Sequence, residues 1–232
     1  MKISGYQKTT LLDYPGHVAA TVFTGGCNFR CPFCHNGDLV LYPDSFPVIS
    51  EEEFFSFLEK RKHILTGVCI SGGEPTLQPD LAEFIRHIHS LSLLVKLDSN
   101  GFRPDVLHSL LQEKLLDYVA MDIKSSKESY SLAAGIPGLE IQKIEESVSL
   151  LEHSDIAHEF RTTLVRGIHS EKDLISIGKW LAPDSLYFLQ SYKENDAVID
   201  PSCSSFSTEE LNHFLSVVQT HLPKTSLRGI DV

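Results

Sequence analysis

Apolar residues along the chain form two patterns. Some lie in short continuous runs, and others recur every three to four residues and so form a stripe along one face of a helix. Residues 81–88 and 141–151 carry apolar side chains at the stripe spacing, which predicts two helices that each bury one face. The short runs end at Gly, Ser, Asn or charged residues and predict six β-strands. These are residues 18–24, 67–71, 93–98, 118–123, 158–165 and 186–190.

The alternation of strands and helices favours parallel pairing through right-handed crossovers. We therefore expect an α/β fold with its chemistry at the carboxyl ends of the strands. Six strand–helix units are fewer than the eight of a complete barrel. Ser50 with Glu53, and Ser207 with Glu210, fit the capping box that starts a helix. Because neither a fixed-period repeat nor a linker-like segment interrupts the chain, we expect one domain.

Composition and charge narrow the class of protein. The 232 residues are 42% hydrophobic and 22% charged, which is typical of a globular domain and excludes collagen-like and largely disordered chains. A net charge of −11 without a block of basic residues argues against nucleic acid as a partner. The chain lacks a secretory signal and any stretch near the ~20 apolar residues of a membrane span. We expect a cytoplasmic protein that binds neither nucleic acid nor membrane.

Five cysteines, an odd number, argue against a disulfide framework. Cys27, Cys31 and Cys34 follow the first predicted strand at the spacing C-x3-C-x2-C. Thiolates hold iron–sulfur clusters, and three ligands on a cubane would leave one iron open to another molecule. A structural zinc site that includes His35 is the alternative, although crowding of the ligands in one loop makes a closed tetrahedron awkward. The other two, Cys69 and Cys203, are interpreted as a buried small apolar residue and a surface thiol.

Several motifs together resemble a known superfamily. The cysteine spacing, the aromatic residue before the last cysteine and the later Ser-Gly-Gly-Glu-Pro are similar to the radical S-adenosylmethionine (SAM) superfamily. Within it, the chain resembles the activating enzymes of glycyl radical enzymes, and most of all the anaerobic ribonucleoside-triphosphate reductase activating protein group. The segments that carry the likeness are Leu11-Leu12-Asp13-Tyr14-Pro15-Gly16, Cys34-His35-Asn36, Ser71-Gly72-Gly73-Glu74-Pro75, Asp98-Ser99-Asn100-Gly101 and Met121-Asp122-Ile123-Lys124.

The resemblance implies a fold and a reaction. The fold would be a partial (β/α)6 barrel, with a leader over residues 1–17, a core over 18–192 and a C-terminal extension with a helix over 193–232. The three clustered cysteines would hold a 4Fe-4S cluster whose fourth iron is chelated by the methionine amine and carboxylate of SAM. An electron from the cluster would cleave SAM and release a 5′-deoxyadenosyl radical, which would take a Cα hydrogen from a glycine.

The resemblance also implies partners. The glycine would lie on a loop of a transiently bound glycyl radical enzyme, either an anaerobic ribonucleotide reductase or a formate-lyase-like enzyme. A flavodoxin- or ferredoxin-like protein would donate the electron, in anaerobic metabolism. The alternative within the superfamily is a small-molecule enzyme that resembles the 7-carboxy-7-deazaguanine synthases. A zinc-stabilised binding module is the alternative from a different class.

The same resemblance assigns residues to SAM. Gly72 and Gly73 would allow close backbone approach, and Glu74 would accept a hydrogen bond from the SAM amine. Phe33 would pack on adenine, unless it is an apolar plug beneath the loop, and His35 would border the nucleoside. The remaining contacts expected at the strand ends are Asp98, Ser99, Asn100, Asp122, Lys124 and Arg161.

An alternative for Arg161, a candidate cation site and a departure from related enzymes complete the sequence-based predictions. Arg161 could instead form a surface ion pair with Glu159. A monovalent cation would be held by Asp98, Ser99, Asp122 and the carbonyl of Ala120. The chain departs from formate-lyase-type activating enzymes, which have Asp-Gly-Pro-Gly where it has Asp13-Tyr14-Pro15-Gly16, and whose histidine near the end of the sixth strand is replaced within Gln190-Ser191-Tyr192-Lys193.

Overall fold

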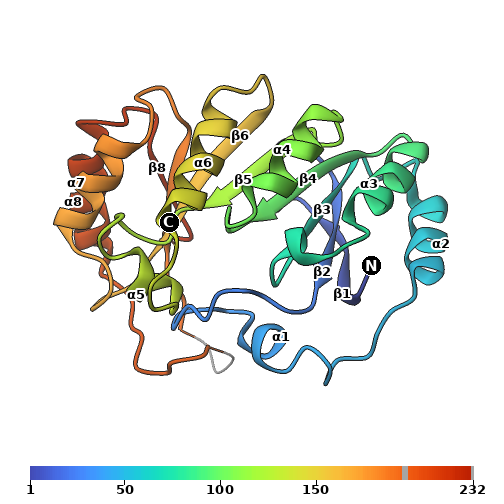
Figure 1. The fold of residues 1–232 in the computed structure, drawn as a ribbon, viewed down its shortest axis with the longest axis horizontal. Helices are drawn as coiled ribbons and strands as arrows, with labels where there is room; N and C mark the ends of the chain where they lie inside the picture. Colours follow the sequence, from blue (N-terminus) through green and yellow to red (C-terminus); the bar gives the residue numbers. More distant parts are fainter. Residues whose placement is uncertain (195–197, 231–232) are drawn as a thin grey trace.

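A single curved sheet forms the centre of the computed structural model, which describes residues 1–194 and 198–230 (Figure 1). Its eight strands are ordered along the sheet as they are along the chain, and all neighbours pair in parallel except the first two, which are antiparallel. The strands are β1 (Ile3–Thr10), β2 (Ala19–Thr24), β3 (Gly67–Gly72), β4 (Leu94–Ser99), β5 (Tyr118–Asp122), β6 (Ala157–Leu164), β7 (Tyr187–Ser191) and β8 (Ser226–Arg228).

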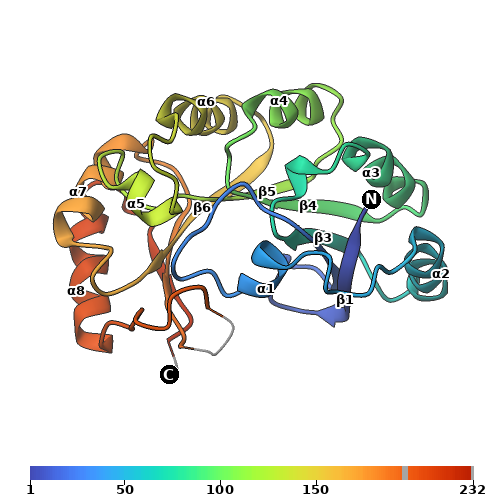
Figure 2. The same cartoon turned by 60° about the horizontal axis from the view of Figure 1, so that its bottom comes forward.

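The longer helices cover the outer side of this sheet as an arc, whereas α1 and α5 lie near the loop that follows β2 (Figure 2). Within the described residues, β1 and β8 remain the two ends of the sheet, so the barrel is open. The helices are α1 (Gly37–Leu41), α2 (Glu51–Arg61), α3 (Leu81–Ser90), α4 (Pro104–Gln112), α5 (Tyr130–Ala134), α6 (Ile141–Glu152), α7 (Glu171–Trp180) and α8 (Thr208–Gln219), with a 3-10 turn at Pro75–Leu77.

The predicted partial barrel is confirmed, and the six predicted strands correspond to β2 through β7. The two segments with a predicted apolar stripe form the helices α3 and α6, and each helix buries its apolar stripe against the sheet. Sequence reasoning missed β1, which lies inside the expected leader, and β8. β1 is half exposed and is held by edge pairing with β2, while β8 spans only three residues, so neither carries a clear apolar pattern.

The loop between β1 and β2 closes the amino-terminal end of the barrel. Tyr14 in this loop is 2% exposed, and its ring lies 6.0 Å from that of Tyr118 at the start of β5. Gly67, at the start of β3, makes room for it, because a Cβ atom there would meet the Tyr14 ring at 2.8 Å. With this end closed, the carboxyl ends of the parallel strands provide the accessible face.

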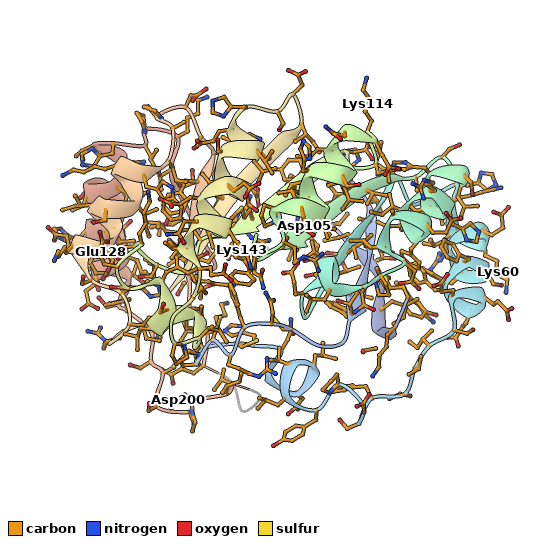
Figure 3. The ribbon with its side chains drawn as sticks, viewed as in Figure 1. Lys60, Asp105, Lys114, Glu128, Lys143 and Asp200 are labelled. Carbon is orange, nitrogen blue, oxygen red and sulfur yellow. The ribbon has the colours of Figure 1, made fainter. Side chains whose placement is uncertain are left out.

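Charged residues such as Lys60, Lys114 and Glu128 lie on the periphery (Figure 3) and are exposed. Among the described residues, no helix combines the length and apolar character needed to cross a membrane.

Candidate active site

A cavity of about 440 Å³ lies at the carboxyl ends of the parallel strands. Every residue that the resemblance assigned to the cluster or to SAM lines it, whereas Ala120 does not. Parallel pairing explains this convergence, because it brings the ends of successive strands to one edge of the sheet. The cavity also contains residues that sequence reasoning did not single out as site residues, namely Asp13, Phe29, Asn36, Val40, Ser71, Thr163 and Gln190.

The cysteine-bearing loop, residues 25–36, is held on two sides by close backbone contacts. On one side Glu74 N–H donates to the Gly26 carbonyl (2.8 Å), and on the other Arg30 N–H donates to the Ala134 carbonyl (2.9 Å). A Cβ atom on Gly73 would lie 1.9 Å from the Gly26 oxygen, and one on Gly135 would lie 2.1 Å from the Arg30 oxygen. Glycine is therefore required at both positions, and the loop is clamped between the segment after β3 and the end of α5.

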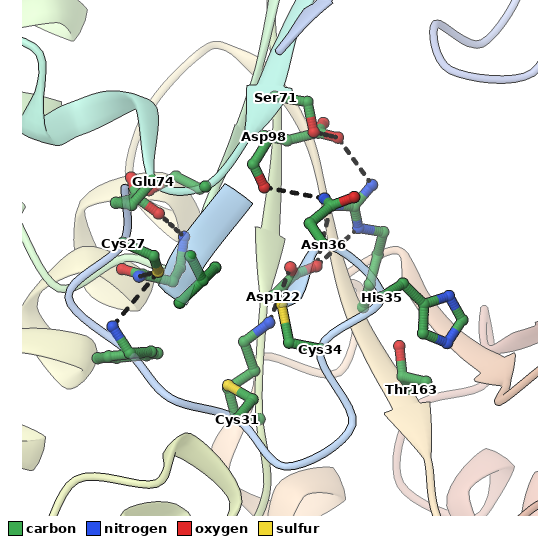
Figure 4. A pocket seen from close by; sticks show the side chains of 18 of the residues that line it. Cys27, Cys31, Cys34, His35, Asn36, Ser71, Glu74, Asp98, Asp122 and Thr163 are labelled. Atoms are coloured by element: carbon green, nitrogen blue, oxygen red, sulfur yellow. Dashed lines mark hydrogen bonds and ion pairs between the residues drawn. The ribbon is translucent and has the colours of Figure 1, made fainter. Parts of the chain in front are cut away.

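The three thiols of this loop line the cavity as free cysteines. Burial raises the pKa of Cys27 to about 12 and that of Cys31 to about 11. Both thiols therefore stay protonated at neutral pH unless bound metal stabilises the thiolates, since metal binding releases the proton. Figure 4 shows Cys31 and Cys34 close to one another, with Cys27 on the other side of the loop.

These residues fit a cubane cluster better than a zinc ion. In the described part of the chain, no group of three or more His, Cys, Asp or Glu side chains could hold a metal ion as they stand, whereas structural zinc needs four ligands that converge on one ion. In a cubane each thiolate binds a different iron, so the thiols need not converge. The buried Asn28 Nδ2 beside Cys27 has no hydrogen-bond partner among the described residues, and it could donate a hydrogen bond to a sulfide of the cluster.

A chain of alternating charges crosses the strand ends. Arg161 Nε on β6 donates to Asp122 Oδ1 on β5 (2.9 Å), and its guanidinium also reaches Asp98 Oδ2 on β4 (3.4 Å). Lys96 pairs with Asp98, and Lys124 Nζ lies 3.0 Å from Asp122 Oδ2. Figure 4 shows Asp98 and Asp122 on the cavity wall. Burial by itself would raise the pKa of Asp122, but the charges of Arg161 and Lys124 lower it to about 2. Asp122 is therefore ionised across the physiological range.

This network decides between two sequence-based alternatives. Arg161 lines the cavity. The alternative, a surface ion pair with Glu159, is excluded because Glu159 forms a bidentate pair with Arg228 (2.6 and 2.8 Å). The expected monovalent cation is not supported. Both aspartates are already neutralised by Arg161 and the two lysines, and Ala120 lies outside the cavity lining.

Glu74 connects the segment after β3 to the end of β4. Its carboxylate is 1% exposed and accepts from Thr76 N–H (3.1 Å), Ser99 Oγ (2.9 Å) and Asn100 N–H (2.7 Å). Burial raises the pKa of Glu74, and these hydrogen bonds oppose that rise. The carboxylate ties the Gly-Gly-Glu-Pro segment to the end of β4, while its role toward the SAM amine stays a prediction.

Two aromatic residues border the cavity from the cysteine loop. Phe33 is 5% exposed, and its ring packs edge-on against His169 with centroids 5.9 Å apart. It acts as an apolar plug and also lines the cavity, so the adenine contact stays a prediction. His35 packs against Tyr192 at 5.2 Å, and burial lowers the pKa of His35.

The two remaining cysteines have different outcomes. Cys69 is fully buried, as predicted, and its sulfur lies 3.8 Å from Lys96 Nζ. The prediction that Cys203 is a surface thiol is wrong, because it is only 8% exposed. The turn that contains it contacts the cysteine loop, where Asp200 N–H donates to the Pro32 carbonyl (2.8 Å), and Cys203 belongs to the buried apolar core.

Comparisons with known proteins agree with the site. Residues 21–177 match the family model of the radical SAM superfamily. A Methanocaldococcus jannaschii protein with the provisional name glycyl-radical enzyme activating enzyme is 34% identical over 199 residues, 84% of this chain and 81% of the relative. The pyruvate formate-lyase-activating enzyme of Staphylococcus epidermidis is 28% identical over 73% of this chain and 71% of its own. A Thermococcus kodakarensis protein provisionally named GTP 3′,8-cyclase is 32% identical over 55% of this chain and 42% of its own.

Solved structures share the fold. TYW1 with a bound lysine-pyruvate adduct superposes with a TM-score of 0.64 at 18% identity, over 88% of this chain and 74% of TYW1. SuiB from Streptococcus suis superposes with a TM-score of 0.67 at 14% identity, over 90% of this chain. The match spans 48% of the SuiB chain. At these identities the likeness supports the architecture alone.

Proposed function

Because this chain belongs to the radical SAM superfamily, we propose that it activates a glycyl radical enzyme, by removing a Cα hydrogen from one glycine of that partner. The observation that carries the proposal is the 34% identity to a protein with that provisional name across most of both chains. A pyruvate formate-lyase-activating enzyme is a second relative over most of its length.

In this proposal Cys27, Cys31 and Cys34 hold the 4Fe-4S cluster. When bound, the cluster supplies the electron that cleaves SAM reductively. The methionine part of SAM carries an ammonium and a carboxylate, so it requires both a negative and a positive partner. Asp122, kept ionised by its neighbours, and Lys124 offer the two signs side by side at the cavity wall. Arg161 holds Asp122 in place from the next strand.

The charge of the cavity supports a polypeptide over a nucleotide triphosphate. Among the described residues that line it, the permanently charged cations are Lys124 and Arg161, and Asp98 and Asp122 match them in number, so the lining has no excess of positive charge. A triphosphate carries several negative charges and is bound in proteins by unpaired cations, metal ions or backbone N–H groups. The main chain around a glycine is neutral and imposes no such requirement.

The partner enzyme and the electron donor complete the proposal. The partner is an anaerobic ribonucleotide reductase or a formate-lyase-like enzyme whose glycine-bearing loop enters through the open side of the barrel. A flavodoxin- or ferredoxin-like protein reduces the cluster. Both contacts are transient, because the activating enzyme is released once the radical is installed.

The proposal is tested by anaerobic reconstitution with iron and sulfide, followed by reduction with dithionite in the presence of SAM. Purified anaerobic ribonucleotide reductase and pyruvate formate-lyase serve as partners, and Cys31→Ala as the control. We expect 5′-deoxyadenosine together with a glycyl radical signal in the electron paramagnetic resonance spectrum of one partner, and neither product with Cys31→Ala. Efficient hydrogen abstraction from a small molecule such as GTP, with no radical on either partner, would overturn the proposal in favour of a small-molecule enzyme.

A further inference from the structure

Two neutral side chains line the cavity beside the charged network. Thr163 on β6 and Gln190 on β7 are directly opposite one another in the parallel register, and both are half buried and line the cavity. Residues in register on neighbouring strands point to the same face of a sheet. Among the described residues, neither the Thr163 hydroxyl nor the Gln190 carboxamide has a hydrogen-bond partner.

The cavity therefore has two chemically different walls. Asp98, Asp122 and Arg161 form a charged wall from β4 to β6, whereas Thr163 and Gln190 form a neutral wall from β6 to β7. In Figure 4 Thr163 lies on the side of His35, away from Glu74 and Cys27. The neutral wall is next to β8, the end of the sheet, and so it lies toward the open side of the barrel.

A target glycine presents only its main chain, since it has no side chain to recognise. A peptide unit offers one N–H donor and one carbonyl acceptor. A glutamine carboxamide supplies the complementary acceptor and donor, and a threonine hydroxyl supplies either. A charged partner here would be a poor match, because a buried charge requires an opposite charge that a peptide unit lacks.

We propose that Gln190 and Thr163 recognise the main chain on either side of the target glycine. This inference rests on the proposed function and assigns its substrate contact. The Gln190 carboxamide accepts from the glycine N–H and donates to a neighbouring carbonyl, and the Thr163 hydroxyl adds a hydrogen bond to the adjoining peptide unit. These contacts use only the main chain, so they suit a target residue that has no side chain to bind.

The test uses the reconstituted enzyme and the blocked peptide acetyl-Ala-Ala-Gly-Ala-Ala-amide with both Cα hydrogens of glycine replaced by deuterium. Deuterium that appears in 5′-deoxyadenosine, measured by mass spectrometry, reports abstraction from the glycine. We expect Gln190→Leu to lower kcat/KM for deuterium transfer roughly tenfold, as the loss of one or two neutral hydrogen bonds implies. Gln112→Leu is the matched control, because Gln112 is exposed at the end of α4, outside the cavity, and it should leave kcat/KM unchanged.

A second peptide distinguishes recognition from a merely structural role. N-methylglycine in place of glycine removes the N–H while keeping the deuterated Cα. Wild type should discriminate against this peptide roughly tenfold, and Gln190→Leu should hardly discriminate, because the partner of the N–H is already missing. Equal losses on both peptides in the variant would assign Gln190 a structural role and overturn the inference.

Thr163 provides an independent check through an isosteric pair of variants. Thr163→Val removes the hydroxyl and should lower kcat/KM several-fold, whereas Thr163→Ser keeps the hydroxyl and should retain activity. If wild type transfers deuterium and Gln190→Leu does so as efficiently, the inference fails while the proposed function stands. If wild type transfers no deuterium and installs no radical on either protein partner, the proposed function itself fails.

Discussion

Substitution of Gly135 by alanine should displace the cysteine loop without touching any ligand. Gly135 ends α5 with φ of +66°, a left-handed conformation, and a Cβ atom there would lie 2.1 Å from the carbonyl oxygen of Arg30. Real Cβ atoms essentially never approach a heavy atom within 3.0 Å, so the two segments must separate by about 0.9 Å. Arg30 lies between two cysteines of the loop, and the separation therefore moves the cluster ligands.

The size of the effect can be worked out from its parts. The left-handed conformation costs an alanine about 1 kcal/mol. The hydrogen bond from Arg30 N–H to the Ala134 carbonyl (2.9 Å) is strained or lost, which costs about 1 kcal/mol more. The free energy of unfolding should fall by about 2 kcal/mol. The chemistry should suffer more than the stability, because a misplacement near 1 Å can lower a rate about 100-fold.

Gly138→Ala is the matched control for backbone strain. Gly138 lies three residues further on with φ of +71°, and a Cβ atom there would meet nothing within 4 Å. Both variants should lose about 1 kcal/mol of stability from the backbone, measured by chemical denaturation. Only Gly135→Ala should also lose iron and sulfide per chain after reconstitution and cleave SAM about 100-fold more slowly. Equal SAM cleavage by the two variants would refute the reasoning that this contact positions the loop.

Four further predictions follow from the site. Cys31→Ala should bind no normal cluster yet remain folded by circular dichroism, since it removes one side chain from a loop; a full complement of iron in this variant would contradict the ligand assignment. SAM cleavage by wild type should be equal in potassium, sodium and tetramethylammonium buffers, because Arg161 and the two lysines already neutralise Asp98 and Asp122; a potassium requirement in wild type would restore the cation site. Arg161→Leu should cost about 2–3 kcal/mol of unfolding free energy, because it removes one of the two cations that each carboxylate contacts. Burial lowers the pKa of His169 below its usual value of 6.5, so just below pH 6.5 the unfolded chain binds more protons than the folded chain. The free energy of unfolding should therefore fall as the pH is lowered through this range, by at most ~1.4 kcal/mol per pH unit from this group. His169→Gln should flatten this pH dependence in urea unfolding measured from pH 5 to pH 8, and an unchanged slope would exclude His169 as its source.

The cysteine loop shows what could be predicted from local sequence. Cys27, Cys31 and Cys34 lie within eight residues, so their common purpose is visible before any fold is known. The strands β2 to β7 were predicted because buried parallel strands are continuous apolar runs. β1 and β8 were not, because each is stabilised by pairing with a neighbour rather than by its own apolar pattern. The same limit misplaced Cys203, which joins the apolar core only through contacts with residues distant in the sequence.

Sequence alone determined the chemistry of the molecule, namely three thiols, a glycine-rich strand end and acidic residues at two further strand ends. Tertiary structure decided which of these groups meet. Arg161 reaches Asp98 across 63 residues of chain and Asp122 across 39, and only the parallel register makes them neighbours. The sequence located the replacement of the sixth-strand histidine only to residues 190–193, and the contact of Gly135 and the pairing of Thr163 with Gln190 were not visible. A glycine contact or a neutral polar wall exists only once distant segments pack together, and no local pattern records which segment that will be.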